Sequence, residues 1–118
     1  MSEGLSQHRS RMPITVEANL KIPNFTVRPV DGPARLVDNR SVRWIKRITV
    51  ETIPKPGDTV QLSTRRGPPF DGTVTRVEWN DARNLFVVSC TYAKRSITGD
   101  NHDALVVDPD WIANHLPT

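Results

Sequence analysis

Several features are scarce in this sequence of 118 residues, and each absence excludes a class of protein. The single cysteine, Cys90, cannot form a disulfide within the chain, so a reducing and cytoplasmic location is expected. No apolar run approaches the roughly 18 residues of a membrane span. The first 12 residues also lack the apolar stretch of a signal peptide, so we expect no membrane contact.

Side chains suited to catalysis or metal binding are scarce as well. Cys90 alternates with Val88 and Tyr92, which predicts a packed core thiol, and no histidine lies near it in the sequence to act as a base. The run Asp-Asn-His-Asp at 100–103 lacks the glycine and the distant glutamate of a calcium-binding loop. We therefore expect no enzyme activity, no catalytic residue, no metal and no cofactor.

Proline is abundant instead, with ten residues spread along the chain, and it interrupts the stretches that could form long helices. Strand patterns occupy the intervals, most clearly in the middle of the chain. Val60 and Leu62 alternate with polar residues, and residues 72–79 are rich in β-branched side chains. Residues 85–92 are apolar on both sides near their start, which predicts a central strand.

The apolar residues of the 72–79 segment change parity, so a β-bulge near Gly72 or Arg76 is expected. One face of these strands should be buried and form a small core. The residues predicted to be largely buried are Val60, Leu62, Val74, Val88 and Cys90.

The middle of the chain contains, in order, a Pro-Gly-Asp turn at 56–58, a short strand, a long loop, a Gly-Thr-Val segment at 72–74, and Trp79 before a tight turn. This pattern resembles SH3-like small barrels of the KOW and Tudor kind. The resemblance covers about a third of the chain, and it concerns the fold. It implies a module that binds peptide, RNA or the ribosome. A methyl-lysine reader would need an aromatic cage, and Trp79 with Tyr92 provides too few aromatic rings for one.

Further strands are predicted outside this stretch. Residues 14–22 alternate cleanly between apolar and polar side chains, which indicates a half-buried strand. Residues 25–30 are expected to form a strand with an edge proline, followed by an Asp-Gly-Pro turn at 31–33. Residues 45–53 and 105–107 have the composition of strands.

Residues 1–12 are polar and are expected to form a disordered tail, while residues 13–118 should form a single β domain. A short helix is predicted at about 108–116, because Asp108 is suited to the N-cap and Pro109 to the first helical position. The predicted fold is mainly β, a small antiparallel barrel or sandwich with a short C-terminal helix.

Charge is unevenly distributed along the chain. Residues 98–118 contain four aspartates and no Lys or Arg, so the net charge of +3 conceals a strongly basic remainder. If the basic side chains converge, they form a patch for phosphates or an acidic partner; the alternative is a scatter of solvated arginines. The acidic segment can either mask such a patch in cis or pair with a basic partner. The candidate contacts are Arg43, Arg47, Arg65, Arg66, Lys94 and Arg95.

The three tryptophans are candidate interface aromatics, with burial in the core as the alternative: Trp44, Trp79 and Trp111. No RNA-binding motif is present, and only Trp44 stands beside a basic residue where a base could stack. We therefore expect a non-enzymatic interaction module, an adaptor or assembly subunit that binds a protein partner. The alternative is a nucleic-acid-binding accessory protein that uses an arginine-rich surface. The sequence specifies neither the partner nor the oligomeric state.

Overall fold

The structure is a computed structural model that describes residues 13–116, so the predicted tail at residues 1–12 lies outside it. Strands account for 48% of the described residues and helix for 9%, which confirms the predicted mainly β fold. The elements, in chain order, are β1 (Ile14–Lys21), β2 (Phe25–Val27), β3 (Arg35–Val37), β4 (Val42–Val50), β5 (Thr59–Leu62), β6 (Phe70–Asn80), β7 (Leu85–Tyr92), α2 (Gly99–Val107) and β8 (Ile112–His115).

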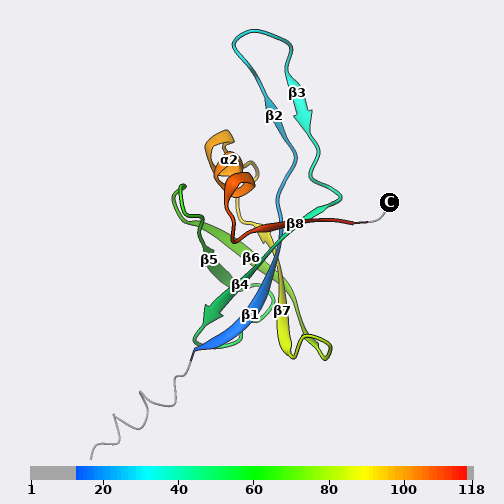
Figure 1. Ribbon diagram of the computed structural model, residues 1–118, viewed down its shortest axis with the longest axis vertical. Coiled ribbons are helices and arrows are strands. Elements are labelled where there is room, and N and C mark those ends of the chain that lie inside the picture. Colours follow the sequence, from blue (N-terminus) through cyan, green and yellow to red (C-terminus); the bar gives the residue numbers. More distant parts are fainter. Residues whose placement is uncertain (1–12, 117–118) are drawn as a thin grey trace, which may run out of the picture.

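Six strands form one curled sheet, a half-barrel, in the order β5-β6-β7-β1-β4-β8 (Figure 1). Neighbouring strands run antiparallel, except that β1 and β7 are parallel, a pairing that the expected antiparallel arrangement did not include. A parallel pair needs a long connection, which the intervening elements supply here. As predicted, β7 is a central strand, and β6 has a β-bulge between Val74 and Arg76.

The concave side of the half-barrel holds the core. β1 contributes Val16, Ala18 and Leu20, which are fully buried because alternate residues of a strand face the same side. One of the five residues predicted for the core, Val60, is half-buried. The other four are buried as predicted: Leu62, Val74, Val88 and Cys90.

Side chains bridge the gap between the two ends of the curled sheet, where no ladder pairing joins the described strands. The Lys46 ammonium on β4 and the indole N–H of Trp111 both donate to the carbonyl oxygen of Ser63, just after β5, at 3.2 and 2.9 Å. Ile48 of β4 and Val60 of β5 each pack against both hydrophobic clusters of the core. The half-barrel is therefore completed by side-chain packing.

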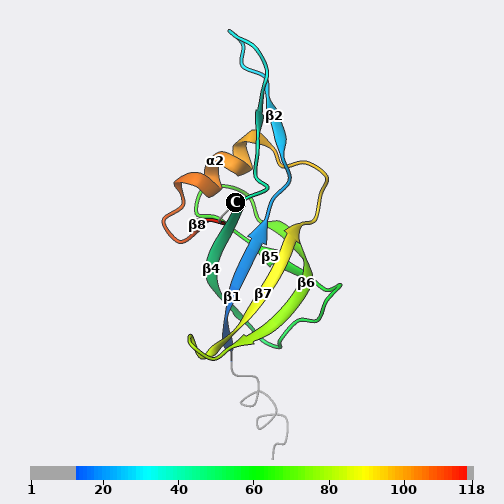
Figure 2. The ribbon, with the colours of Figure 1, turned by 90° about the vertical axis from the view of Figure 1, so that its right-hand side faces the viewer.

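Helix α2 covers the end of the half-barrel nearest the β2–β3 hairpin (Figures 1 and 2). Leu105 of α2 is fully buried in the same cluster as Trp44 and Tyr92. Burying one leucine side chain contributes about 1.5–3 kcal/mol. Ala104 and Leu105 are the buried residues of α2, so the helix depends on a small anchor and on its cap.

The position of the helix corrects the sequence prediction. Because α2 spans Gly99–Val107, the predicted helix at 108–116 and the predicted strand at 105–107 are both wrong. The helix begins early because Thr98 is its N-cap, and the Thr98 hydroxyl accepts a hydrogen bond from the backbone N–H of Asn101 at 3.1 Å.

Asp108 ends a helix rather than beginning one. Its backbone N–H donates to the carbonyl oxygen of Leu105 at 3.3 Å. Its carboxylate accepts the backbone N–H groups of Arg65 and Asp110, at 2.7 and 2.8 Å. These bonds hold a turn at residues 109–110 after α2, and the last described residues then pair with β4 as strand β8.

Candidate interaction surfaces

The β2–β3 hairpin is a separate two-stranded sheet that projects from the half-barrel beyond α2 (Figures 1 and 2). We call this hairpin the arm, and we call residues 28–34, between its strands, the tip. The side chain of Val30 in the tip is 100% exposed, and Leu36 on β3 is 62% exposed. The arm therefore presents two large apolar side chains to solvent.

The sequence of the tip explains why it does not extend the hairpin ladder. Pro29 and Pro33 have no backbone N–H to donate. Gly32 has a φ of +140°, which residues with a side chain rarely adopt. The strand predicted at 25–30 therefore ends at Val27, and the predicted turn becomes part of a wider loop.

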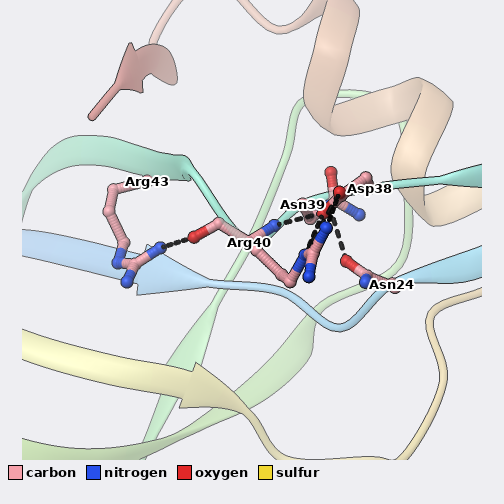
Figure 3. A network of polar contacts seen from close by, with 5 residues as sticks. All are labelled: Asn24, Asp38, Asn39, Arg40 and Arg43. Atoms are coloured by element: carbon pink, nitrogen blue, oxygen red, sulfur yellow. Dashed lines mark hydrogen bonds and ion pairs between the residues drawn. The ribbon is translucent and has the colours of Figure 1, made fainter. Parts of the chain in front are cut away.

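A set of polar contacts fixes the arm where it leaves the half-barrel, as Figure 3 shows. The backbone N–H of the buried Asn39 donates to the side-chain oxygen of Asn24 at 2.6 Å, and the Asn39 side-chain amide donates to the carbonyl oxygen of Pro23 at 2.9 Å. The Arg40 guanidinium hydrogen-bonds both oxygens of Asp38, and this contact lowers the pKa of Asp38 to about 2. The two bonds of Asn39 join the two sides of the base of the arm, and the Arg40–Asp38 contact braces one side.

A ring contact connects the base of the arm to α2. The rings of Phe25 and His102 lie 4.7 Å apart between centroids and are tilted by 60°. Burial lowers the pKa of His102 from its usual value, and this effect outweighs the opposing charge of Asp103. Burial therefore favours the neutral imidazole, which packs against Phe25 as an aromatic ring.

A groove of about 760 Å³ crosses the convex side of the sheet, between β8 and the turn that follows β6. Ile45 and Arg47 lie on this convex side because they alternate with Trp44 and Ile48, which face the core. A second hollow of about 330 Å³ shares residues with it and continues toward Trp79. We call the first of these the outer groove and define it by Glu17, Ile45, Arg47, Arg83, Asp110 and Ile112.

An ion pair between a buried carboxylate and a half-exposed arginine forms one wall of the outer groove. Glu17 is 5% exposed, and its carboxylate pairs with the guanidinium of Arg83, which lies in the turn between β6 and β7. A buried carboxylate without a partner is strongly destabilising, so Arg83 is held over the convex side of the sheet. Arg47 lies directly opposite Glu17 in the β1–β4 register and has no ion-pair partner among residues 13–116.

The six predicted basic contacts do not gather into one patch. Arg47 lines the outer groove, Arg66 lies in a hollow between α2 and the loop before β6, and Lys94 lines a third hollow near the start of β6. Arg95 is exposed in the bend after β7. Arg43 donates to a backbone carbonyl oxygen at the base of the arm, at 3.1 Å (Figure 3).

The acidic C-terminal segment contacts part of the basic set in cis. The Arg65 guanidinium binds both oxygens of Asp110 at 3.0 and 3.1 Å, and this contact raises the pKa of Arg65. Arg66 shares its hollow with Asp100 and Asp103. The sequence left two roles open for this acidic segment, contact with basic residues of the same chain or pairing with a basic partner. The first is the one seen at the loop that carries Arg65 and Arg66.

Two of the three candidate interface tryptophans belong to the core, so the prediction is wrong for them. Trp44 is 6% exposed and Trp111 is 4% exposed, because both pack beneath α2. Trp79 is 50% exposed and stands edge-on to Phe86, with ring centroids 5.0 Å apart. Its indole N–H donates to the carboxylate of Asp81. A partner contact at Trp79 stays a prediction.

Sequence reasoning missed both the arm and the outer groove. Glu17 occupies a polar position of a cleanly alternating strand, and nothing local indicates that it is buried. Its partner Arg83 is 66 residues away in the sequence. The run of Pro29, Asp-Gly and Pro33 around the tip did signal a loop, but no local pattern tells whether a hairpin packs on the sheet or projects from it.

Taken together, the fold and these surfaces define a small β half-barrel with a projecting hairpin arm. No protein-family model matches the chain, and no curated protein or solved structure is significantly similar to it. Within residues 13–116, no helix has the length and apolar character to cross a membrane. The same part of the chain brings together no group of three or more His, Cys, Asp or Glu side chains that can hold a metal ion.

Proposed function

We propose that this chain is a non-enzymatic interaction module, an adaptor or assembly subunit, that holds a protein partner through its arm. The observation that carries the proposal is the tip, residues 28–34, which is exposed throughout. The Val30 side chain there lies wholly in solvent. Covering a valine side chain is favourable by about 1.5–3 kcal/mol, so a partner that buries Val30 gains free energy from it.

The construction of the arm supports the same proposal. Its two strands have three residues each, and an isolated hairpin of this size is only marginally stable. The contacts of Asn39 and the packing of Phe25 on His102 hold the base, whereas the tip stays uncovered. An anchored base with a free tip is typical of a contact element. The resemblance to SH3-like barrels of the KOW and Tudor kind, which serve as binding modules, forms part of the proposal.

The alternative, a nucleic-acid-binding accessory protein, has weaker support. Arg66 and Lys94 line hollows other than the outer groove that Arg47 lines, and Arg65 already pairs with Asp110. Binding of a labelled RNA or DNA at low salt, with an affinity that falls steeply as salt rises, would favour this alternative.

The proposal is tested by replacing residues 28–34 with Asn-Gly. Val27 and Arg35 pair directly, so a two-residue turn can join them and preserve the base of the arm. We expect this tip-replaced chain to fold like the wild type by circular dichroism and to lose the proteins that the wild type captures from its native extract. Lys55→Glu, at an exposed residue outside the arm, is the control and should capture them normally. Capture of the same proteins by the tip-replaced chain would refute the proposal.

A further inference from the structure

The tip of the arm carries an apolar side chain flanked by charges of opposite sign. Val30, Arg28 and Asp31 are all exposed. None of the ion pairs within residues 13–116 involves Arg28 or Asp31. A surface that matches the tip therefore needs an apolar floor with one cationic and one anionic group beside it.

The outer groove has this composition. Ile45 is half-buried and Ile112 is 64% exposed, and the two residues are directly paired across β4 and β8. Arg47 beside them has no ion-pair partner among the described residues. Asp110 pairs with Arg65, and both side chains are partly exposed, so water screens the pair. The two carboxylate oxygens of Asp110 have further acceptor positions, so Asp110 can accept a second cationic partner beside Arg65.

The arm of one chain cannot reach the outer groove of the same chain. Figures 1 and 2 show the arm projecting past α2, whereas the outer groove extends toward the turn between β6 and β7, at the opposite end of the half-barrel. We infer that the outer groove receives the tip of a second copy of this chain. The inference rests on the proposed function, because it names the partner that the arm holds. The expected contacts are Val30 with Ile45 and Ile112, Asp31 with Arg47, and Arg28 with Asp110.

Such a contact joins two different surfaces, so each copy gives one tip and receives another. Heterologous contacts of this kind produce rings or open chains of copies. The tip is small compared with the roughly 800 Å² that each partner buries in a standard interface. We therefore expect each contact to have a dissociation constant in the micromolar range or weaker, reinforced when several copies join.

Sedimentation velocity of the purified chain, over concentrations from about 1 to 500 μM, tests the inference. The wild type should associate as concentration rises. Arg47→Glu removes the cationic edge of the groove and should raise the dissociation constant at least about tenfold, through repulsion of Asp31. The chain with residues 28–34 replaced by Asn-Gly should stay monomeric. An equal mixture of these two variants should form a one-to-one pair, because the tip of the first fits the intact groove of the second.

Two further variants sharpen the result. Asp31→Lys combined with Arg47→Glu reverses both charges and should restore self-association, whereas the control Lys55→Glu, at an exposed residue of the loop between β4 and β5, should associate like the wild type. A wild type that stays monomeric throughout, an Arg47→Glu chain that associates normally, or a mixture without pairs would overturn the inference. Arg47 lies outside the arm, so tip-dependent capture of another protein by a monomeric chain leaves the proposed function standing. If the tip-replaced chain captures the same proteins as the wild type, the proposed function itself is refuted.

Discussion

Close packing at single residues determines what the concave side of the half-barrel can accept. Gly72 on β6 faces Cys90 of β7 and Leu62 of β5. A Cβ atom added at Gly72 would lie 3.2 Å from the Cys90 sulfur and 3.2 Å from the Leu62 Cδ1. Neither neighbour can retreat freely, because both side chains are at most 2% exposed within the core. Glycine at this position is therefore a requirement of packing between three strands.

Gly72→Ala should destabilise the fold by about 1–3 kcal/mol, because the new methyl group overpacks the core. Urea unfolding followed by circular dichroism measures the change. Gly99→Ala is the matched control, since nothing lies within 4 Å of its added Cβ and alanine favours the helix there. Equal free energies of unfolding for the two variants would contradict the packing assigned to Gly72.

The thiol of Cys90 should be unreactive in the folded protein. Burial raises the pKa of Cys90 to about 11, and the side chain is 2% exposed, so both thiolate and access are lacking at neutral pH. A chromogenic disulfide reagent at pH 8 should label the folded chain slowly and the urea-unfolded chain within seconds to minutes. Rapid labelling of the folded chain would show that the concave side is open to solvent.

Among the elements, α2 depends most on a single cap. Thr98→Ala removes the hydroxyl that accepts the Asn101 N–H and should lower the free energy of unfolding by about 1 kcal/mol. Ser96→Ala, at an exposed residue outside the helix, should change it by less than about 0.5 kcal/mol. Chemical denaturation gives both values, and a Thr98→Ala chain as stable as the Ser96→Ala chain would rule out this cap.

The strands could be predicted from the sequence, whereas the place of the helix could not. Strand prediction succeeds for β1, β5 and β7 because alternation of apolar and polar residues is a local signal of one buried side. The Asp108-Pro109 pair is also a strong local signal, yet contacts 43 and 48 residues away in the sequence decide its conformation. The Asp108 carboxylate accepts the Arg65 N–H and the Trp111 indole donates to the Ser63 carbonyl oxygen, so the chain turns at residues 109–110 and continues as β8.

The candidate surfaces were predictable only in part, for the same reason. Composition identified the basic residues, but their grouping depends on the tertiary fold, which places Asp110 on Arg65 and Arg47 in the outer groove. The turn residues of the tip were recognised as a loop, yet their exposure follows from the hairpin leaving the sheet. No local sequence signal distinguishes Trp44 and Trp111, which are buried, from Trp79, which is exposed. The difference comes from packing beneath α2.

The whole molecule combines a packed half-barrel with two exposed surfaces, the arm and the outer groove. Packing across the ends of the sheet and the cover of α2 complete the half-barrel, and the arm projects from one end (Figure 1). The outer groove crosses the convex side. The polar contacts at the base of the arm, of which Figure 3 draws several, hold together the two chain segments that leave the half-barrel. Such a molecule can present a tip and receive one without changing its core.

The central claim is that the tip of the arm contacts a protein, and site-specific photo-crosslinking tests it most directly. A photoreactive amino acid replaces Val30 in one chain and Lys55, exposed in the loop between β4 and β5, in a matched control. Both chains are irradiated in the native extract, and adducts are detected by electrophoresis and mass spectrometry. The account predicts a discrete protein adduct from position 30 and none from position 55. Equal adducts from both positions, or none from position 30, would contradict it.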